Sequence, residues 1–167
     1  MYSDSGELTY NDDGTVFKKP EWYSQHEKFL PVFEKYELDF LPKVLSYDDN
    51  GYTYRYVDGV TIRYAIDNGI FELNQYVILE MKMAMDDIWK IFYKMSIENL
   101  PADYFFWYND PHLENLIWRD ASKQLILLDM DSICIGQYVP LSYVSNLFYQ
   151  QLETHWIKTS IPEKEHL

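Results

Sequence analysis

The segment from Tyr76 to Ser96 constrains the fold of this sequence more than any other. Its apolar residues recur at intervals of three and four, the spacing that gathers side chains on one face of an α-helix. The apolar face consists of Ile78, Met81, Met85, Ile88, Phe92 and Met95. Charged residues occupy the opposite side: Glu80, Lys82, Asp86, Asp87, Lys90 and Lys94. We therefore predict a long amphipathic helix whose methionine stripe belongs to a protein core rather than to a ligand groove.

The acidic balance of the chain narrows the partners that we expect for it. The 167 residues carry a formal net charge of −13, and the acidic residues are spread along the chain. Such a surface repels nucleic-acid phosphates and anionic lipids, which argues against nucleic acid or a membrane as the main partner. Because 47% of the residues are apolar, the chain can build a core for one domain or for two small lobes that share it.

The N-terminus and the single cysteine indicate the cellular compartment in which we expect the protein. The opening residues MYSDSGELTY lack the basic start and apolar run of a signal peptide, and the longest apolar runs are too short to span a bilayer. Cys134 is the only cysteine, so it cannot form an internal disulfide. We expect it to be a small buried residue rather than a reactive thiol. These observations predict a cytoplasmic protein.

The first 59 residues predict a small lobe with the element order β-β-α-β-β. Glycine-containing turn signals at 11–14 and 48–51 each join two strands into a hairpin. The second strand, Thr15–Lys19, is ended by Pro20. Between the hairpins a helix is predicted, with Pro31 breaking or kinking its end, from the spacing of Trp22, His26, Phe29, Leu30 and Phe33. The return strand of the second hairpin has alternating tyrosines: Tyr52, Tyr54 and Tyr56.

A second motif, in residues 108–132, combines acidic residues with two short apolar runs. "NLIW", the turn "RDASKQ" and "LILLD" predict a hairpin whose second strand is buried on both faces. That hairpin would place Asn115 at the start of one strand and Asp129 at the end of the other, with Asp110 on the preceding loop. Carboxylate and amide oxygens suit Mg²⁺, which also takes substrate phosphates as ligands. A further acid can accept a proton, so the motif predicts a phosphoryl-transfer site.

These residues carry a resemblance to a known family. "YNDPHLENLIW" resembles the catalytic loop of the protein-kinase-like superfamily at Asn109, Asp110 and Asn115, and "LILLDMD" resembles its metal-binding segment at Asp129 and Asp131. The branch that they resemble most is that of the aminoglycoside phosphotransferases and choline kinases. The resemblance implies ATP and Mg²⁺ as cofactors, a small-molecule hydroxyl as acceptor, Asp110 as its base, and Asn115, Asp129 and Asp131 around the metal.

The resemblance extends upstream to a nucleotide-binding lobe. "TVFKK" resembles the strand that carries the phosphate-binding lysine, which implies Lys18, and "HEKFL" resembles the helix whose glutamate pairs with that lysine, which implies Glu27. "YRYVDGVTI" resembles the strand and hinge around adenine. The hinge residues would be Tyr56, Val57 and Asp58. The fold implied is α+β: a miniature two-lobed kinase-like fold with a reduced antiparallel-sheet N-lobe, residues 1–59, and a short, mainly helical C-lobe, residues 60–167.

Departures from the family keep other functions open. Tyr108 stands where the family has a histidine, and only Gly6 and Gly14 precede Lys18, so the glycine-rich loop over ATP is nearly absent. One alternative is therefore a catalytically inactive pseudokinase that serves as a binding or structural module. Abundant tyrosine and tryptophan would suit an interface with a protein partner or within a homo-oligomer. Another is a haloacid-dehalogenase-type phosphatase, because "LILLDMD" also has that family's strand ending in D-x-D. The few residues after Asp131 argue against the phosphatase.

Overall fold

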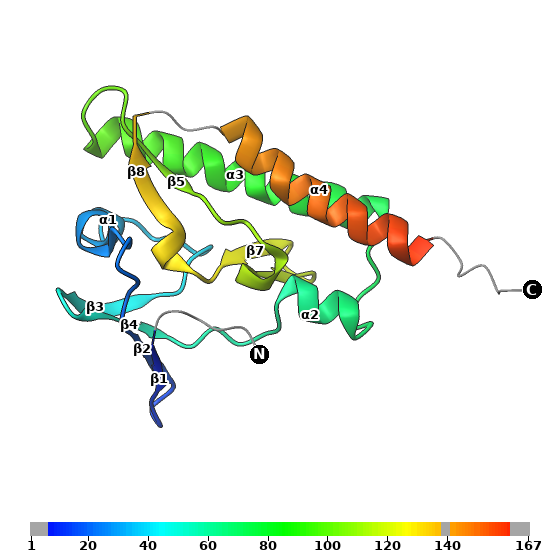
Figure 1. Ribbon diagram of the computed structural model, residues 1–167, viewed down its shortest axis with the longest axis horizontal. Coiled ribbons are helices and arrows are strands. Elements are labelled where there is room, and N and C mark those ends of the chain that lie inside the picture. Colours follow the sequence, from blue (N-terminus) through cyan, green and yellow to red (C-terminus); the bar gives the residue numbers. More distant parts are fainter. Residues whose placement is uncertain (1–6, 138–140, 161–167) are drawn as a thin grey trace, which may run out of the picture.

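The computed structural model describes residues 7–137 and 141–160, and it has a mixed α+β architecture (Figure 1). The strands are β1 (Leu8–Tyr10), β2 (Thr15–Lys18), β3 (Val44–Asp48), β4 (Gly51–Arg55), β5 (Phe105–Tyr108), β6 (Leu116–Arg119), β7 (Gln124–Leu127) and β8 (Ile133–Gly136). The α-helices are α1 (His26–Phe33), α2 (Ile62–Asp67), α3 (Gln75–Asn99) and α4 (Leu141–Ser160). Two single-turn 3₁₀ helices, η1 (Leu113–Asn115) and η2 (Met130–Ser132), flank the β6–β7 hairpin.

The N-terminal part forms a four-stranded antiparallel sheet in the order β1-β2-β4-β3. The predicted element order β-β-α-β-β is confirmed, with β2 ending at Lys18, one residue before the predicted end. The register places Lys18 opposite Tyr52. Gly51 begins β4 at a φ of +155°, and a Cβ at this position would lie 2.2 Å from the carbonyl oxygen of Lys18. Only glycine therefore allows β4 to approach β2 this closely.

Helix α1 differs from its prediction at the start. The helix begins at His26, and the Trp22 side chain lies before it with 92% of its surface exposed. The prediction that Trp22 belongs to the apolar face is therefore wrong, because the chain is still non-helical at that position. The other four predicted residues are buried, and Pro31 lies inside the helix, close to its end. The buried residues are His26, Phe29, Leu30 and Phe33.

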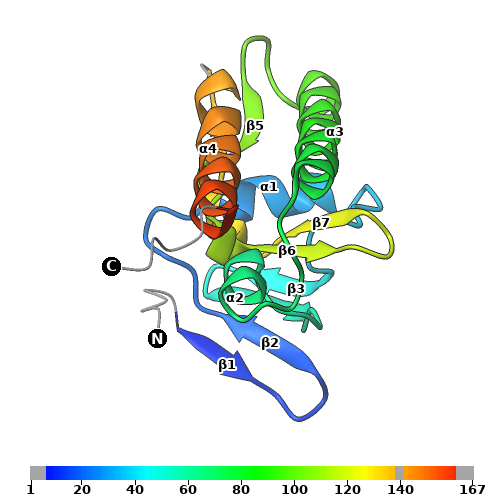
Figure 2. The same cartoon turned by 90° about the vertical axis from the view of Figure 1, so that its right-hand side faces the viewer.

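Helix α3 confirms the prediction from periodicity. It begins after Asn74, whose side chain accepts hydrogen bonds from the backbone N–H groups of Tyr76 and Val77 at 3.0 and 3.1 Å, an N-cap that satisfies donors at the helix start. All six residues of the predicted apolar face are buried. The last helix, α4, runs beside α3 (Figure 2). Lys82 and Glu153 form an ion pair of 2.7 Å between these helices.

The remaining strands form two further antiparallel pairs, β6–β7 and β5–β8. The β6–β7 hairpin was predicted, and Leu125, Ile126 and Leu127 of β7 are all buried. The β5–β8 pairing was not predicted, because it joins segments that are distant in sequence. Among the described residues, none of the helices is long and apolar enough to cross a membrane.

One hydrophobic core connects the sheet region with the helices. The Phe33 ring of α1 lies 5.8 Å from that of Phe92 in α3 and 5.2 Å from that of Phe106 in β5, measured between centroids. Buried residues of the same core come from both sides of the predicted boundary at residues 59 and 60. The elements on the two sides therefore depend on each other for burial of their apolar surface.

Candidate active site

Lys18 at the end of β2 is held between two carboxylates from the η2 turn. Its Nζ lies 2.9 Å from Asp129 Oδ1 and 3.2 Å from Asp131 Oδ2. The lysine is buried, with 6% of its surface exposed. Burial by itself lowers the pKa of Lys18, but the nearby charges of Asp129 and Asp131 outweigh that effect and raise it above the ordinary value. Lys18 therefore stays charged. Two other predicted site residues, Asp129 and Asp131, contact it directly although they are far from it in sequence.

Asp131 is saturated with donors from the protein. Its Oδ1 accepts a hydrogen bond from the Tyr52 hydroxyl at 3.1 Å, and its Oδ2 accepts one from the backbone N–H of Glu21 at 3.1 Å, besides the ion pair with Lys18. Its side chain has 0% exposure. The predicted role of Asp131 as a metal ligand does not suit this environment, because a cation would have to displace these donors. The geometry suits an anchor for Lys18 instead.

Asp129 has a different environment from Asp131. Its Oδ1 contacts Lys18, its Oδ2 accepts a hydrogen bond from the Ser132 hydroxyl at 2.8 Å, and its side chain keeps 22% exposure. The β6–β7 hairpin brings Asn115 to the same end, because the carbonyl oxygen of Asn115 accepts the N–H of Leu128 at 2.8 Å. Asn115 and Asp129 thus occupy opposite ends of one hairpin in sequence and the same end in space.

Asp110 lies in the loop between β5 and η1 and contacts Asn115 directly. The Asn115 Nδ2 donates to Asp110 Oδ2 at 3.1 Å, and His112 Nε2 lies 2.9 Å from Asp110 Oδ1. Burial raises the pKa of Asp110, and the charge of Asp129 raises it further, while His112 and Asn115 oppose the shift. The carboxylate of Asp110 is therefore more basic than an ordinary aspartate and close enough to Asp129 for their charges to interact.

Tyr108 at the end of β5 is fully buried. Burial raises the pKa of its hydroxyl, and the charges of Asp129 and Asp110 act in the same direction. The following N–H, that of Asn109, donates to the carbonyl of Ser132 at 2.9 Å. The loop that carries Asp110 is thus tied by its backbone to the turn that carries Asp129.

Glu27 is not brought to Lys18. It lies on the exposed side of α1, and the ion pairs of Lys18 with described residues are those to Asp129 and Asp131. The helix begins only at His26, so Glu27 lies in its first turn and faces outward. Two residues that sequence reasoning missed, Tyr52 and Glu21, contact Asp131 instead. They are 79 and 110 residues away from Asp131 in sequence, so no local sequence pattern could predict these contacts.

The predicted hinge, Tyr56, Val57 and Asp58, lies in the connection from β4 to α2 (Figure 1). The Tyr56 N–H donates to the carbonyl of Gly14 at 3.0 Å, and the Asp58 carbonyl accepts from Arg119 of β6 at 3.4 Å. These contacts place the connection between the β1–β2 turn and the β6–β7 hairpin. Val57 is half-buried there.

The oxygen atoms at Asn115 and Asp129 fit a hard divalent cation by type. Among the residues that the structure describes, no group of three or more His, Cys, Asp or Glu is arranged to hold a metal ion. Mg²⁺ does not require such a group, because one or two carboxylates, waters and substrate phosphates commonly complete its octahedron. A buried carboxylate oxygen nearby, Glu21 Oε1, has no hydrogen-bond partner among the described residues. The backbone N–H of the same residue donates to Asp131 Oδ2.

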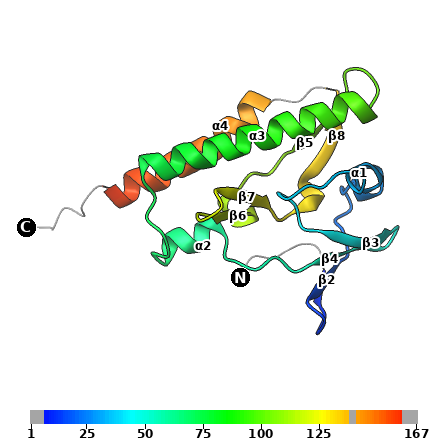
Figure 3. The same cartoon turned by 180° about the vertical axis from the view of Figure 1, so that it is seen from behind.

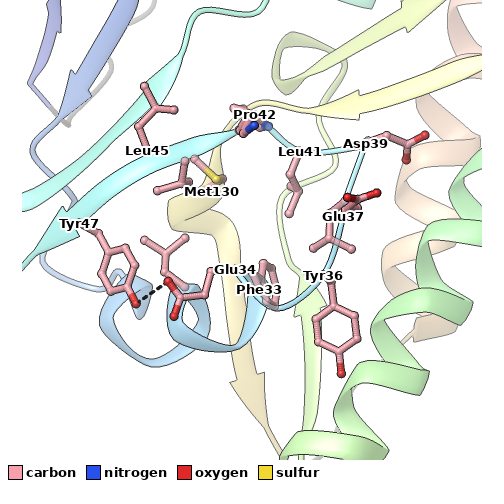
Figure 4. A pocket seen from close by; sticks show the side chains of 14 residues that line it. Phe33, Glu34, Tyr36, Glu37, Asp39, Leu41, Pro42, Leu45, Tyr47 and Met130 are labelled. Carbon is pink, nitrogen blue, oxygen red and sulfur yellow. Dashed lines mark hydrogen bonds between the residues drawn. The ribbon is translucent and has the colours of Figure 1, made fainter.

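A separate hollow of about 720 Å³ lies between α1, β3 and the segment that joins them (Figure 4). Its apolar wall includes Phe33, Leu41 and Met130, and Glu34 accepts a hydrogen bond from the Tyr47 hydroxyl at 3.3 Å at its edge. None of the residues predicted for nucleotide, metal or catalysis lines it. The hollow is therefore distinct from the site around Lys18, although Met130 adjoins Asp129 and Asp131 in sequence.

Comparison with known proteins gives likenesses among solved structures alone. No family model matches the chain, and no curated protein matches it. Among solved structures, the chain is similar to one described as the ternary complex of streptomycin, ATP and APH(2″)-IIa, with 15% sequence identity and a TM-score of 0.43. The match covers 95% of this chain and 80% of that chain.

Proposed function

We propose that this chain is a kinase-like, ATP- and Mg²⁺-dependent phosphotransferase that acts on the hydroxyl of a small molecule. The observation that carries the proposal is the convergence around Lys18 and Asp129. A buried lysine from a sheet contacts the aspartate at the end of a hairpin, while Asn115 of the same hairpin contacts Asp110. Phosphoryl transfer needs these parts: a cation for phosphate oxygens, ligands for a metal, and a base for the acceptor.

Each residue has a distinct role in this proposal. Asp110 orients the acceptor hydroxyl and takes its proton, which suits its raised pKa. Lys18 contacts the nucleotide phosphates and is held in position by Asp131. Asn115 and Asp129 would hold Mg²⁺, which when bound neutralises charge on the phosphates. Tyr56, Val57 and Asp58 border the adenine. Glu27 has no role in this version, because it does not contact Lys18.

We also propose that the chain is organised as two lobes, residues 1–59 and 60–167. The four-stranded sheet with α1 would be the nucleotide-binding lobe, and α2 to α4 with the two short strand pairs would be the second. The ion pair of Lys18 with Asp129 joins the two parts across the proposed boundary. A nucleotide bound there would contact both lobes.

Thermal melting with and without MgATP tests nucleotide binding directly. A ligand at one hundred times its dissociation constant stabilises a protein by about 2.7 kcal/mol, which corresponds to a shift of roughly 5–10 °C for a domain of this size. We expect this shift in the wild type and its loss in Asp129→Asn. The matched control is Asp49→Asn, which removes one charge at an exposed turn position and should keep the shift.

A transfer assay then tests the catalytic role. ATP consumption in the presence of a panel of small alcohols should be abolished in Asp110→Asn, whereas the MgATP melting shift should remain. Unchanged transfer in that variant would show that Asp110 is not the base. No melting shift for the wild type at millimolar MgATP would overturn the proposal and leave the inactive binding module as the better description.

A further inference from the structure

The outward side of α3 carries a regular row of exposed side chains. Its members follow one another at alternating intervals of three and four, the heptad spacing of a coiled-coil seam. The outer seam, as we call it, consists of Tyr76, Leu79, Met83, Asp86, Lys90, Tyr93 and Ile97. Figure 3 shows α3 in front of α4 and β5. The seam is separate from the buried stripe that faces the core.

The apolar members of the outer seam are exposed to an unusual degree. Between 52% and 81% of the surface of each is accessible, and the set comprises Tyr76, Leu79, Met83, Tyr93 and Ile97. Single exposed apolar residues are common on proteins, but several large ones gathered on one helix face mark an interaction surface. The two charged members of the row, Asp86 and Lys90, lie at its centre.

Two members of the seam are already ordered by neighbouring elements. The Tyr93 ring stacks on that of Phe105 with a centroid separation of 5.8 Å and an interplanar angle of 8°. Asp86 accepts a hydrogen bond from the Tyr149 hydroxyl of α4 at 2.5 Å. A partner that docks on this face would therefore meet a partly fixed surface, which reduces the entropy lost on binding.

The outer seam is complementary to the same seam of a second copy that runs in the opposite direction. A second α3 laid antiparallel, with a two-fold axis at position 88, places Leu79 opposite Ile97 and Met83 opposite Tyr93. In the same register Asp86 lies opposite Lys90, and the symmetry repeats each pair. A parallel arrangement in register would instead place Asp86 opposite Asp86 and Lys90 opposite Lys90, which is repulsive.

From this complementarity we infer that the outer seam is a homodimer interface, in which the α3 helices of two copies pair antiparallel. The apolar pairs on either side of the axis supply burial, and the central Asp86–Lys90 pairs set register and orientation, as polar residues do in coiled coils. Central polar pairs weaken such an interface, and the charge of −13 on each copy opposes association. The dimer is therefore reversible and depends on concentration. None of the residues proposed for catalysis belongs to the seam.

Charge exchange tests this register by sedimentation equilibrium at 0.15 M salt. The wild type should shift from its monomer mass of 20.1 kDa to twice that value as concentration rises. Asp86→Lys and Lys90→Asp each create two repulsive pairs, and each should weaken the dimer at least tenfold. The double variant restores the attraction with reversed polarity and should recover the wild-type dissociation constant.

Folding is monitored separately, because Asp86 also contacts Tyr149 and Lys90 also contacts Asp87. Circular-dichroism melting at a concentration where all variants are monomeric shows whether each still folds. A wild type that stays monomeric at the highest concentration would overturn the inference. Failure of the folded double variant to recover association would overturn the proposed pairing.

Cross-linking distinguishes the two orientations. In a Cys134→Ser background, Leu79→Cys mixed with Ile97→Cys should give a covalent heterodimer with a short thiol-to-thiol reagent. Either variant alone should remain uncross-linked, because 18 residues of helix separate positions 79 and 97, and this is about 27 Å at 1.5 Å per residue. Cross-linking of Leu79→Cys with itself would show a parallel pair and contradict the inference.

Discussion

Lys18 Nζ lies 2.9 Å from Asp129 Oδ1, although 111 residues separate the two in sequence. Asp131 shares the same ammonium group at 3.2 Å. This three-residue cluster joins the N-terminal sheet to the turn after β7, and it is mostly shielded from solvent. Its charges contribute to stability only while all three partners are present. Replacement of any one of them should therefore affect both the stability of the fold and the proposed chemistry.

Replacement of the lysine should destabilise the protein strongly. Lys18→Met leaves the buried carboxylate of Asp131 without a counter-charge, and breaking a buried pair in this way costs on the order of 3 kcal/mol. Urea unfolding should show a lower midpoint for Lys18→Met than for Lys19→Met, the exposed neighbour. A further change, Asp131→Asn in the Lys18→Met protein, should recover part of the loss. Equal midpoints for the two single variants would contradict this account.

The raised pKa of Asp110 gives a pH dependence of defined sign. The ordinary value is 3.8, and in the folded protein the pKa lies above it. The folded state therefore binds this proton more tightly than the unfolded state, so the contribution of Asp110 to stability is greatest below pH 3.8 and falls as pH rises through the folded pKa. Asp110→Asn cannot ionise and avoids the loss. Its melting temperature relative to the wild type should increase from about pH 4 towards neutrality, and an unchanged or falling difference would refute the shift.

His112 opposes the shift of Asp110, so its removal should enlarge that shift. The ring lies 2.9 Å from the Asp110 carboxylate and lowers the pKa of that group. In His112→Gln the carboxyl carbon of Asp110, followed by ¹³C NMR, should titrate at higher pH than in the wild type. A lower or identical titration midpoint for Asp110 would disprove the assignment.

Two methionines of α3 provide a matched test of burial. Met81 has 0% exposure and Met83 has 59%. Met81→Ala removes core contacts and leaves a cavity, which should lower the free energy of unfolding by about 2 to 5 kcal/mol. Met83→Ala should cost less than about 0.5 kcal/mol in dilute, monomeric protein. Chemical denaturation of both variants at low concentration makes the comparison, and similar losses would contradict the helix orientation.

Elements with local signals were the ones that the sequence predicted. The turn at Asp48–Gly51 and the spacing of Ile78, Met81 and Met85 each act within a few residues, and both features are confirmed. The β5–β8 pairing was missed, because Trp107 and Cys134 become neighbours only through the tertiary fold. The partners of Asp131 were not predicted, for the same reason. Its D-x-D pattern suggested a ligand, whereas its surroundings are set by Tyr52 and the backbone of Glu21.

The long sequence separation between Lys18 and Asp129 also has a consequence for protein synthesis. At about 5 to 20 residues per second, a ribosome adds the intervening 111 residues in roughly 6 to 22 s. Throughout that interval the lysine lacks its counter-charges, whereas the rings of Phe92 and Phe106 that cover Phe33 are added before the interval ends. The ion pairs of Lys18 can therefore form only after the β6–β7 hairpin and the turn that follows it have been synthesised.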